Sequence, residues 1–411
     1  MNATTPEVDS AIAAAELRAL ALDSNLKLLK LQGKELLPIV QGGMGVGISA
    51  GGLAGTVASY GAVGTISSVD LRRLHADLYD STKDLAHDPE GHKRINEVNQ
   101  IALTREVQRA RKISGGRGVI GVNIMKAVTA YADYVRTSLE AGVDFVVVGA
   151  GLPLDLPELA TDFPKAALIP ILSDARGVQL VVRKWEKRGR LPDAVVIEHP
   201  RLAAGHLGAA KIEDLGDSRF DFENVIPEVL EFFKSAGYEK EIPLIPAGAI
   251  STYTRLSELQ GIGAAAAQMG TPFAVSREGD AHPNFKQVLA GAKPEDIVEF
   301  QSTAGLPARG VRTHWLDKYV RVESKLRAVA HEKPCHMNFD CLAKCGFRDG
   351  NAAMGQFCID LQLGHALSGE TDKGLFFRGA GTLPFGDQIR SVRELLTFMV
   401  SGRMPLDMTT A

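Results

Sequence analysis

Short apolar runs alternate with longer amphipathic stretches along much of this chain, and this alternation restricts the fold more than any other feature. Short β-branched runs separated by helix-like segments are typical of βαβ units and a parallel sheet. The runs are Leu37–Val40, Ala62–Ile66, Val119–Asn123, Phe145–Val148, Ala167–Leu172, Ala194–Ile197, Ile242–Pro246 and Ala264–Met269. Eight is the number of strands in a TIM barrel. The sequence therefore predicts the α/β class and a (β/α)8 barrel.

Segments without this alternation flank and interrupt the predicted barrel, which we assign to residues 35–275. Residues 1–34 are expected to form an N-terminal helical segment, because alanine and leucine recur at helical spacing over Ala11–Leu31. A long polar stretch at about 70–114 predicts a helical insertion in one connection. Residues 276–411 lose the alternation and end in a helical tail that contains the cysteines. We expect this mainly helical extension to cover the barrel without a large core of its own.

The composition is that of an ordinary globular protein and favours a small-molecule substrate. Of the 411 residues, 45% are hydrophobic and 23% charged, and 46 Lys and Arg nearly balance 49 Asp and Glu for a net charge of −3. Nothing in this balance attracts nucleic acid or anionic lipid. No apolar run approaches the roughly 18–20 residues needed to cross a bilayer. Because the start lacks a secretory signal and four cysteines are too few for a disulfide framework, we expect a cytoplasmic protein.

Glycines crowd the stretch Gly42–Gly55, directly after the first apolar run. The segment Gly45-Val-Gly-Ile-Ser-Ala50 fits the relaxed dinucleotide fingerprint, with Asp70 near the expected distance downstream. A plain tight turn would also use glycines. In a barrel, a planar ring lying against this first loop leaves no room for Cβ atoms. We therefore favour contact with a flavin over a Rossmann site or a plain turn.

Two later segments predict a phosphate site. Ile245–Ser251 ends the seventh run and Ala267–Phe273 ends the eighth, and each has a glycine with a hydroxyl close behind. Backbone N–H groups at a helix start favour an anion, and the loops after strands seven and eight commonly hold phosphate in TIM barrels. Serine and threonine also cap ordinary helices, which is the alternative. The residues expected to hold a phosphate are Gly248, Ala249, Gly270 and Thr271.

A buried strand followed by a histidine loop gives the catalytic candidate. His206 lies between two glycines after the sixth run, where an imidazole can exchange protons near neutral pH. A loop histidine is more often structural, but its place on the face that carries barrel active sites favours catalysis. His199 is the weaker candidate, and Glu198 either bonds a ligand or orients the loop. Asn123, at the end of the third strand, offers an amide to the edge of a ring.

Together these segments resemble the nitronate monooxygenase family, formerly called 2-nitropropane dioxygenases, whose relatives include flavin-dependent enoyl-acyl-carrier-protein reductases and NADH:quinone reductases. The matching stretches are Pro38-Ile-Val-Gln-Gly-Gly-Met-Gly45, Gly121-Val-Asn123, Ala204-Gly-His-Leu-Gly208, Ala247-Gly-Ala249 and Gln268-Met-Gly-Thr271. The resemblance implies FMN and an active-site histidine at His206. The implied cofactor contacts are Gly42, Gly43, Met44, Asn123, Glu198, Gly205, Ala247, Gly248, Ala249, Gln268, Gly270 and Thr271.

The chain departs from the family pattern at two places. The family usually has Glu-Ala-Gly-Gly-His where this chain has Leu202-Ala-Ala-Gly-His206, and Ala249 replaces a glycine of the usual Ala-Gly-Gly turn. Both departures are small, so we expect FMN binding to persist. They leave undecided to which branch of the family the chain belongs.

All four cysteines of the chain lie in the tail, at Cys335, Cys341, Cys345 and Cys358. Clustered cysteines are typical of zinc and iron–sulfur sites, which are one alternative here. The spacing, however, fits neither the paired cysteines of zinc motifs nor the cysteine run of a ferredoxin. A redox or substrate-facing thiol is a second alternative. We predict buried free cysteines and no metal. The family resemblance extends to a similar tail that ends in a Gly-Leu-Phe-like segment, here Gly374–Gly379.

The predicted activity is the oxidation of an alkyl nitronate with O₂ to a carbonyl compound and nitrite. An NAD(P)H-dependent reduction of a quinone or enoyl thioester is the alternative within enzymes, because nicotinamide can stack on a flavin in the same pocket. A flavin- or phosphate-binding barrel without catalysis is the third hypothesis, and an intact His206 loop argues against it. The sequence does not determine the oligomeric state, and a homodimer is compatible with it.

Overall fold

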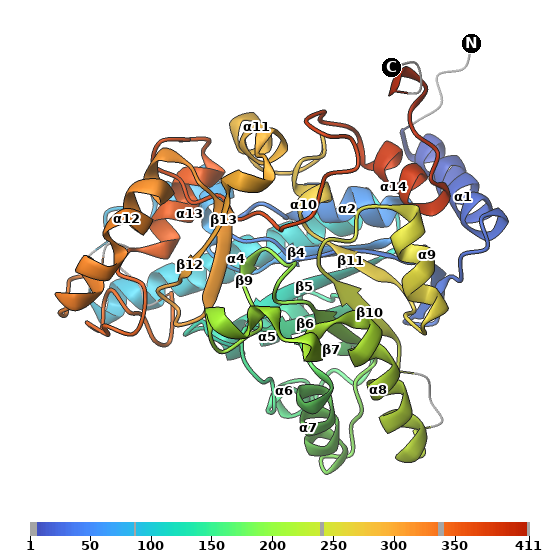
Figure 1. Ribbon diagram of the computed structural model, residues 1–411, viewed down its shortest axis with the longest axis horizontal. Coiled ribbons are helices and arrows are strands. Elements are labelled where there is room, and N and C mark those ends of the chain that lie inside the picture. The colour runs from blue at the N-terminus through green and yellow to red at the C-terminus, as the bar shows by residue number, and fades with distance from the viewer. Residues whose placement is uncertain (1–5, 86–87, 239–241, 336–340, 409–411) are drawn as a thin grey trace.

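The structure is a computed structural model that describes residues 6–85, 88–238, 242–335 and 341–408 (Figure 1). Eight parallel strands close into a barrel in the order β10-β11-β3-β4-β5-β6-β7-β8, and β8 pairs with β10 to complete the ring. The strands are β3 (Ile39–Gln41), β4 (Val63–Ser67), β5 (Val119–Met125), β6 (Phe145–Gly149), β7 (Ala167–Leu172), β8 (Val195–Glu198), β10 (Leu244–Ala247) and β11 (Ala267–Met269). Each lies within or overlaps one of the eight predicted runs, so the TIM barrel is confirmed.

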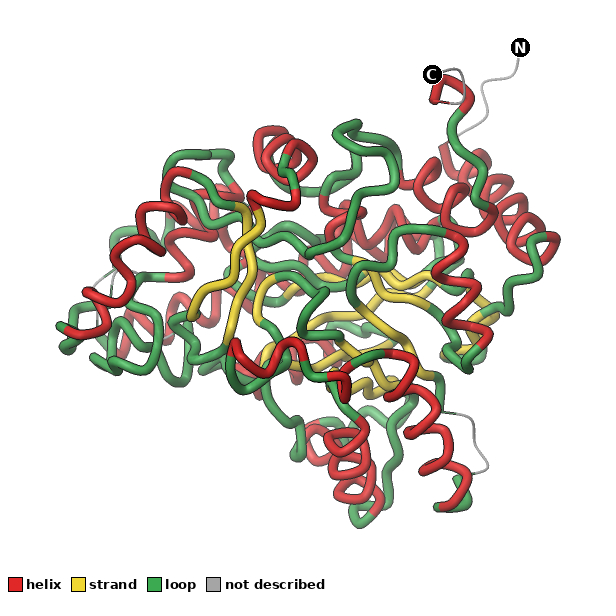
Figure 2. Tube along the Cα trace, viewed as in Figure 1, coloured by secondary structure: helices red, strands yellow, loops and turns green. Residues whose placement is uncertain are grey.

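Helices cover the outside of the barrel between consecutive strands (Figure 2). Their apolar faces pack on strand residues that alternate with those filling the interior, which is why short buried strands and amphipathic helices alternate in the sequence. The helices between strands are α2 (Gly51–Ser59), α5 (Tyr131–Glu140), α6 (Leu156–Leu159), α7 (Ala175–Glu186), α8 (Phe222–Ser235), α9 (Tyr253–Gly261) and, after the last strand, α10 (Thr271–Ala274).

The N-terminal segment differs from the helix predicted over Ala11–Leu31. Helix α1 (Pro6–Asp23) ends earlier, and a hairpin of β1 (Leu29–Leu31) and β2 (Lys34–Leu36) follows. Leu29, Leu31 and Leu36 belong to the same buried cluster as the residues that fill the barrel interior. The hairpin therefore closes the N-terminal end of the barrel. Leucine at alternate positions is typical of a strand. This alternation is short and directly follows the alanine-rich helical pattern, so the sequence predicted one continuous helix.

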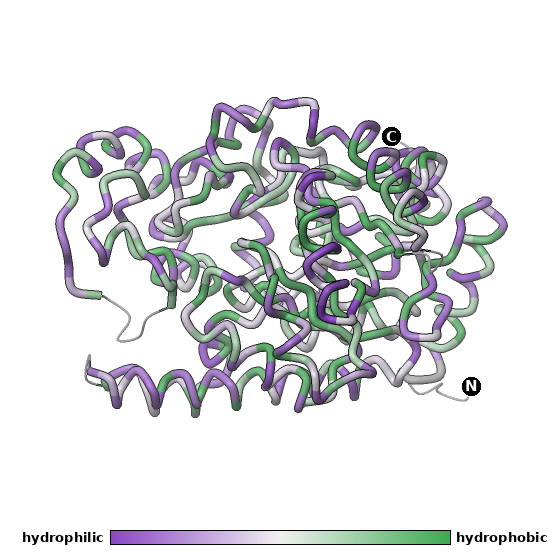
Figure 3. The backbone as a smooth tube through the Cα atoms, turned by 90° about the horizontal axis from the view of Figure 1, so that it is seen from below, coloured by the Kyte–Doolittle hydropathy of each residue, from purple (hydrophilic) through white to green (hydrophobic). Residues whose placement is uncertain are grey.

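The polar stretch between β4 and β5 contains a 3-10 turn (Leu71–Leu74) and the helices α3 (Ala76–Asp80) and α4 (Pro89–Ser114). Helix α4 packs along α2, and hydrophobic and hydrophilic residues interleave along its length (Figure 3). Within the described residues no helix is both long and apolar enough to cross a membrane.

The C-terminal extension contains strands as well as helices. Helix α11 (Pro283–Gly291) precedes a hairpin of β12 (Ile297–Gln301) and β13 (Pro307–Val311), and the helices α12 (His314–Ala328), α13 (Ile359–Leu367) and α14 (Val392–Ser401) follow. The hairpin forms a three-stranded sheet with the short strand β9 (Gly205–His206), which lies in the loop after β8. Helix α14 returns to pack against α1. Its apolar residues join the main core cluster rather than a separate one.

Candidate active site

Two adjoining cavities lie at the C-terminal end of the barrel strands. The larger has a volume of about 590 Å³ and the smaller of about 130 Å³. Barrel loops and the C-terminal extension enclose both. The residues that line both cavities are Gly43, Met44, Glu198, Ala204, Gln268, Gly270 and Thr271. The two spaces therefore form one elongated site with a wide compartment and a narrow end.

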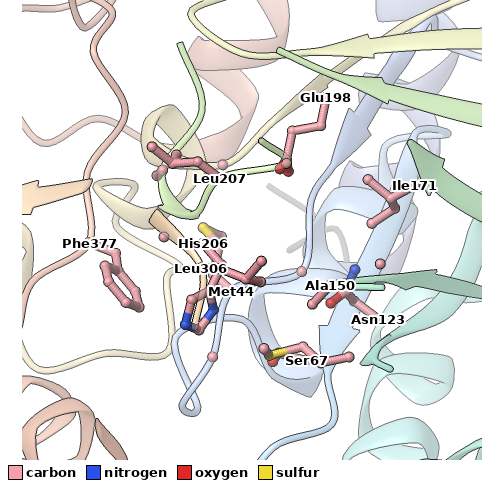
Figure 4. A pocket seen from close by; sticks show the side chains of 18 of the residues that line it. Met44, Ser67, Asn123, Ala150, Ile171, Glu198, His206, Leu207, Leu306 and Phe377 are labelled. Atoms are coloured by element: carbon pink, nitrogen blue, oxygen red, sulfur yellow. The ribbon is translucent and has the colours of Figure 1, made fainter. Parts of the chain in front are cut away.

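His206 faces the wide compartment from β9 (Figure 4). Its backbone is fixed because β9 pairs with β13, with His206 opposite Ala308. Its Nε2 lies 2.8 Å from the Oγ of Ser302, a fully buried residue that directly follows β12. The ring of Phe377 packs on the other side, 5.8 Å between ring centres. The extension therefore holds both the backbone and the ring of this histidine.

Burial sets the protonation of two groups in this site. It lowers the pKa of His206 to about 4, so the imidazole is neutral at pH 7. It also raises the pKa of Glu198 to about 7, because burial disfavours the charged carboxylate. Glu198 lines both cavities at their junction. Its carboxyl can thus carry or release a proton near neutral pH.

The glycine-rich loop after β3 packs tightly on neighbouring strand ends. A Cβ atom on Gly43 would lie 2.2 Å from the Cβ of Asn123, and one on Gly42 would lie 3.2 Å from the side chain of Gln268. The N–H of Met44 donates to the Oγ of Ser49 at 2.8 Å. This packing brings the loop and Asn123 into one wall, as expected from the close approach of these strand ends.

The start of helix α2 is already occupied by acidic side chains. Asp280 accepts hydrogen bonds from the N–H groups of Ala50 and Leu53, both at 2.9 Å, and Glu106 accepts one from Gly51 at 2.7 Å. A pyrophosphate at this helix start would meet two carboxylates. Together with the closed barrel, this contact rules out the Rossmann interpretation of the glycine motif.

The narrow end is built from the loops after β10 and β11 and from the tail. Gly248 and Ala249 have φ angles of +134° and +50°, a region that strains the alanine and explains why the family favours glycine at its position. The hydroxyl of Thr271 accepts a hydrogen bond from Gly379 N–H at 3.2 Å. The tail residues that close this end are Gly379, Gly381, Thr382 and Leu383.

All of the predicted site residues line this elongated space. Those at the narrow end are Gly42, Gly43, Met44, Glu198, Ala247, Gly248, Ala249, Gln268, Gly270 and Thr271, and those reaching only the wide compartment are Asn123, Gly205 and His206. His199 lies elsewhere: its Nε2 is 3.2 Å from Asp221, and it does not line either cavity. The sequence did not predict Ser302 or Phe377. The Gly374–Gly379 segment was the only signal that the tail takes part.

The extension covers the wide compartment almost entirely with apolar side chains. Its lining residues are Phe285, Leu289, Leu306, Leu342, Ile359, Leu363, Ala366, Leu375 and Phe377, with Cys341 and Asp360 as the polar exceptions. The barrel residue Ile171 adds apolar area from the opposite side (Figure 4), and Met125 also lines the compartment. The side of the compartment formed by the extension thus suits an apolar part of a substrate.

The four cysteines have different surroundings. Cys335, Cys341 and Cys358 pack around Ile95. Cys345 is buried, with its Sγ 3.4 Å from the hydroxyl of Thr303. Burial raises the pKa of the Cys341 thiol well above its usual value, which keeps it protonated. Residues 336–340 lie outside the described residues, and among those described no group of three or more His, Cys, Asp or Glu side chains is placed to hold a metal ion.

Comparison with known proteins agrees with this geometry. The model of the nitronate monooxygenase family matches residues 29–402. A probable nitronate monooxygenase of Bacillus subtilis is 26% identical over 205 residues, which cover 50% of this chain and 56% of the relative. One from Staphylococcus saprophyticus is 26% identical and covers 46% and 49%, respectively. The chain thus matches about half the length of these curated relatives.

Two solved structures share the fold over nearly their full length. FabK from Thermotoga maritima has a TM-score of 0.59 and 21% identity, covering 88% of this chain and 91% of that one. Nitroalkane oxidase from Streptomyces ansochromogenes has a TM-score of 0.57 and 18% identity, covering 92% and 97%. At these identities the likeness concerns the fold, including the barrel and its extension.

Proposed function

This chain belongs to the nitronate monooxygenase family, and we propose that it is an FMN-dependent enzyme that oxidises alkyl nitronates with O₂ to a carbonyl compound and nitrite. Family membership makes it a flavin-dependent oxidoreductase. The observation that carries the finer proposal is the neutral His206, held by Ser302 in an apolar compartment that continues into a narrow, glycine-lined end.

The residues present fit FMN. Gly42 and Gly43 line the site with backbone alone, against which a planar ring could lie, and Gly43 packs tightly on Asn123. The narrow end presents the backbone of Gly248 and Ala249 and the hydroxyl of Thr271, which are donors suited to a phosphate. A second nucleotide compartment is absent from the described cavities, which favours a mononucleotide over a dinucleotide. When bound, the flavin would supply an electron acceptor for the nitronate.

The hydrogen bond between Ser302 and Nε2 of His206 leaves Nδ1 for the substrate, and the tautomer decides whether Nδ1 donates or accepts. Ser302 Oγ accepts from the N–H of Ala304 at 3.2 Å, so its own proton is free for the lone pair of Nε2. The imidazole proton then sits on Nδ1, which makes no hydrogen bond within the described chain. In this tautomer His206 donates to a negatively charged nitro group and stabilises it in the desolvated compartment.

The opposite tautomer gives His206 a second role. If Nε2 carries the proton and donates to Ser302, Nδ1 is left with a lone pair that can take the α-proton of a neutral nitroalkane. A positioned serine hydroxyl can serve as donor or acceptor, so the same contact accommodates both tautomers. His206 thus acts as donor for a pre-formed nitronate and as base for a neutral nitroalkane.

Steady-state assays of the purified protein test this proposal. With propyl nitronate we expect O₂ uptake together with equivalent nitrite and aldehyde, and the cofactor released by heat should have the mass of FMN. Reduction of a quinone or an enoyl thioester by NADH or NADPH, without nitrite formation from any nitronate, would contradict it. Release of FAD would contradict the assignment of the narrow end.

A further inference from the structure

A buried arginine lies directly beside the narrow end of the site. Arg378 is 5% exposed and stands between Phe377, which packs on His206, and the tail residues that close the narrow end. Its Nε donates to the carbonyl of Leu289 at 2.9 Å, and Nη1 donates to those of Gly379 and Gly381 at 2.9 and 3.2 Å. Arg378 therefore fixes the backbone of the closing segment.

All of these acceptors are neutral carbonyl groups. The contrast is Arg309, an equally buried arginine that donates to the carbonyl of Ala203 but also pairs with the carboxylate of Glu299 at 2.5 Å. Within the described chain Arg378 has no such ion pair, and burial lowers its pKa. A buried charge without a counter-charge is costly, so an anion close by would stabilise the fold.

The segment that Arg378 fixes packs against both phosphate turns. Gly379 donates its N–H to Thr271, and a Cβ atom on Gly381 would lie 2.9 Å from the Cα of Ala249. The enclosed space of about 130 Å³ has room for a phosphate group. The hydrogen-bond donors of this pocket are backbone N–H groups, hydroxyl groups and the side-chain amide of Gln268, and its lining contains no Arg, Lys or His among the described residues. Arg378 is the cation held directly behind that lining.

We propose that Arg378 is a positioning residue that selects a phosphorylated flavin over the uncharged riboflavin. It supplies the counter-charge for a phosphate dianion and holds Gly379 and Gly381 in the conformation that closes around it. This inference rests on the proposed FMN cofactor, and it assigns the charge selectivity of the site to the C-terminal extension rather than to the barrel.

Flavin titrations of the apoprotein test the proposal without reference to turnover. The quenching of flavin fluorescence gives Kd for FMN and for riboflavin in wild type, Arg378→Met, Arg378→Lys and Arg378→Gln. We expect Arg378→Met and Arg378→Gln to raise the Kd of FMN by about tenfold or more, since a partly desolvated charge pair is lost. The Kd of riboflavin should change little. Arg378→Lys keeps the charge and should retain most of the selectivity.

Lys286→Met is the matched control. Lys286 is also buried, donates to the carbonyl of Arg277 at 2.8 Å, and lies on the same helix as Leu289, but it does not line either cavity. Its loss should lower the melting temperature without changing the ratio of the two Kd values. This separates the general cost of removing a buried cation from a specific effect on phosphate.

Three results would overturn the inference. If Arg378→Met raises the Kd of FMN and of riboflavin equally, Arg378 only stabilises the local structure. If the ratio of the two Kd values is the same as in wild type, Arg378 has no electrostatic role in selecting the phosphate. If Arg378→Met does not fold, equal selectivity in Arg378→Lys and Arg378→Gln would have the same meaning. Failure of the proposed cofactor looks different: wild type itself would then bind riboflavin as tightly as FMN.

Discussion

The barrel and the C-terminal extension contribute to one site in different ways. The barrel contributes residues from the C-terminal part of its strands and from the loops that follow them: Asn123 lies within β5, Gly248 follows β10 and Gly270 follows β11. The extension contributes Ser302, which bonds the catalytic candidate, and the Phe377–Leu383 stretch. Strand ends of any such barrel converge on one face, whereas the extension is particular to this architecture. Under the proposed function the barrel would hold most of the cofactor, while the extension determines the surroundings of His206.

The largest expected effect lies where the two regions meet. His206→Asn should keep the fold and the flavin, because an amide fills similar space and donates a hydrogen bond but cannot take a proton near pH 7. Turnover of a neutral nitroalkane should fall by about 10²–10⁴, the usual contribution of a positioned base. Turnover of a pre-formed nitronate should fall much less. Initial rates of nitrite formation with both substrate forms measure the difference.

The pH profile adds a control to this experiment. Since burial lowers the pKa of His206 to about 4, the neutral imidazole persists down to that pH and activity should be lost only as pH falls through it. The same shift means that the unfolded chain binds the proton first, near pH 6.5, so His206 makes the fold less stable as pH falls from 6.5 to 4. Equal losses for both substrates in His206→Asn would leave His206 as an anion-binding group only.

The second largest effect is expected for a substitution that tests the barrel's contribution to FMN binding alone. Gly270→Asp should raise the Kd of FMN by roughly 10–100-fold, because a carboxylate would face the phosphate in a partly desolvated site. A Cβ atom on Gly270 would lie 3.6 Å from Met44 Sδ, an ordinary contact, so the barrel should still fold. Gly270→Ala is the control that adds the Cβ without the charge. Wild-type FMN affinity in the aspartate variant would place the phosphate elsewhere.

The third effect tests how the extension contributes to catalysis through the hydrogen bond between Ser302 and His206. Ser302→Ala removes the partner of His206 Nε2 and should lower kcat with nitronate roughly tenfold, the value of one buried hydrogen bond. The FMN affinity should not change. Because the serine hydroxyl stabilises the neutral imidazole, its loss should also move the acid limb of kcat/KM to higher pH. Ser302→Thr should restore both quantities; an unshifted pH profile would make Ser302 a packing residue.

The smallest effect is expected in the tail. Replacing Cys341 and Cys345 together by serine should leave the FMN content unchanged, since neither residue lines the narrow end. Metal analysis of anaerobically purified wild type accompanies this test. Stoichiometric zinc or iron that disappears in the double variant would contradict the prediction from the sequence that the cysteine-containing tail binds no metal.

The two regions also differ in how far the sequence predicts them. The barrel strands are short and rich in β-branched residues, and the motifs around Asn123, His206, Gly248 and Gly270 are local, so each could be placed from its own neighbourhood. In the extension the decisive contacts join distant segments. Ser302 reaches His206 across a separation of 96 residues, and β13 pairs with β9 through an interrupted stretch that contains Pro307 and Gly310.

Local patterns carry no information on such pairings. The hairpin β12–β13 becomes a partner of His206 only because the barrel brings the β8 loop to the same place. The Leu29–Leu36 hairpin was missed for a related reason, since its alternation is shorter than the helical pattern that precedes it. The environment of a buried charge is equally hard to predict from local sequence. The carbonyl groups that accept hydrogen bonds from Arg378 come from two separate segments.

The most direct test of the account is anaerobic mixing of the purified flavoprotein with one reductant at a time. We predict that a nitronate bleaches the oxidised flavin absorption within the turnover time, while NADH and NADPH leave it unchanged. His206→Asn should still be bleached by the nitronate but not by the neutral nitroalkane. Rapid bleaching by NADH or NADPH, with none by a nitronate, would contradict the proposed activity and assign the site to the reductase branch of the family.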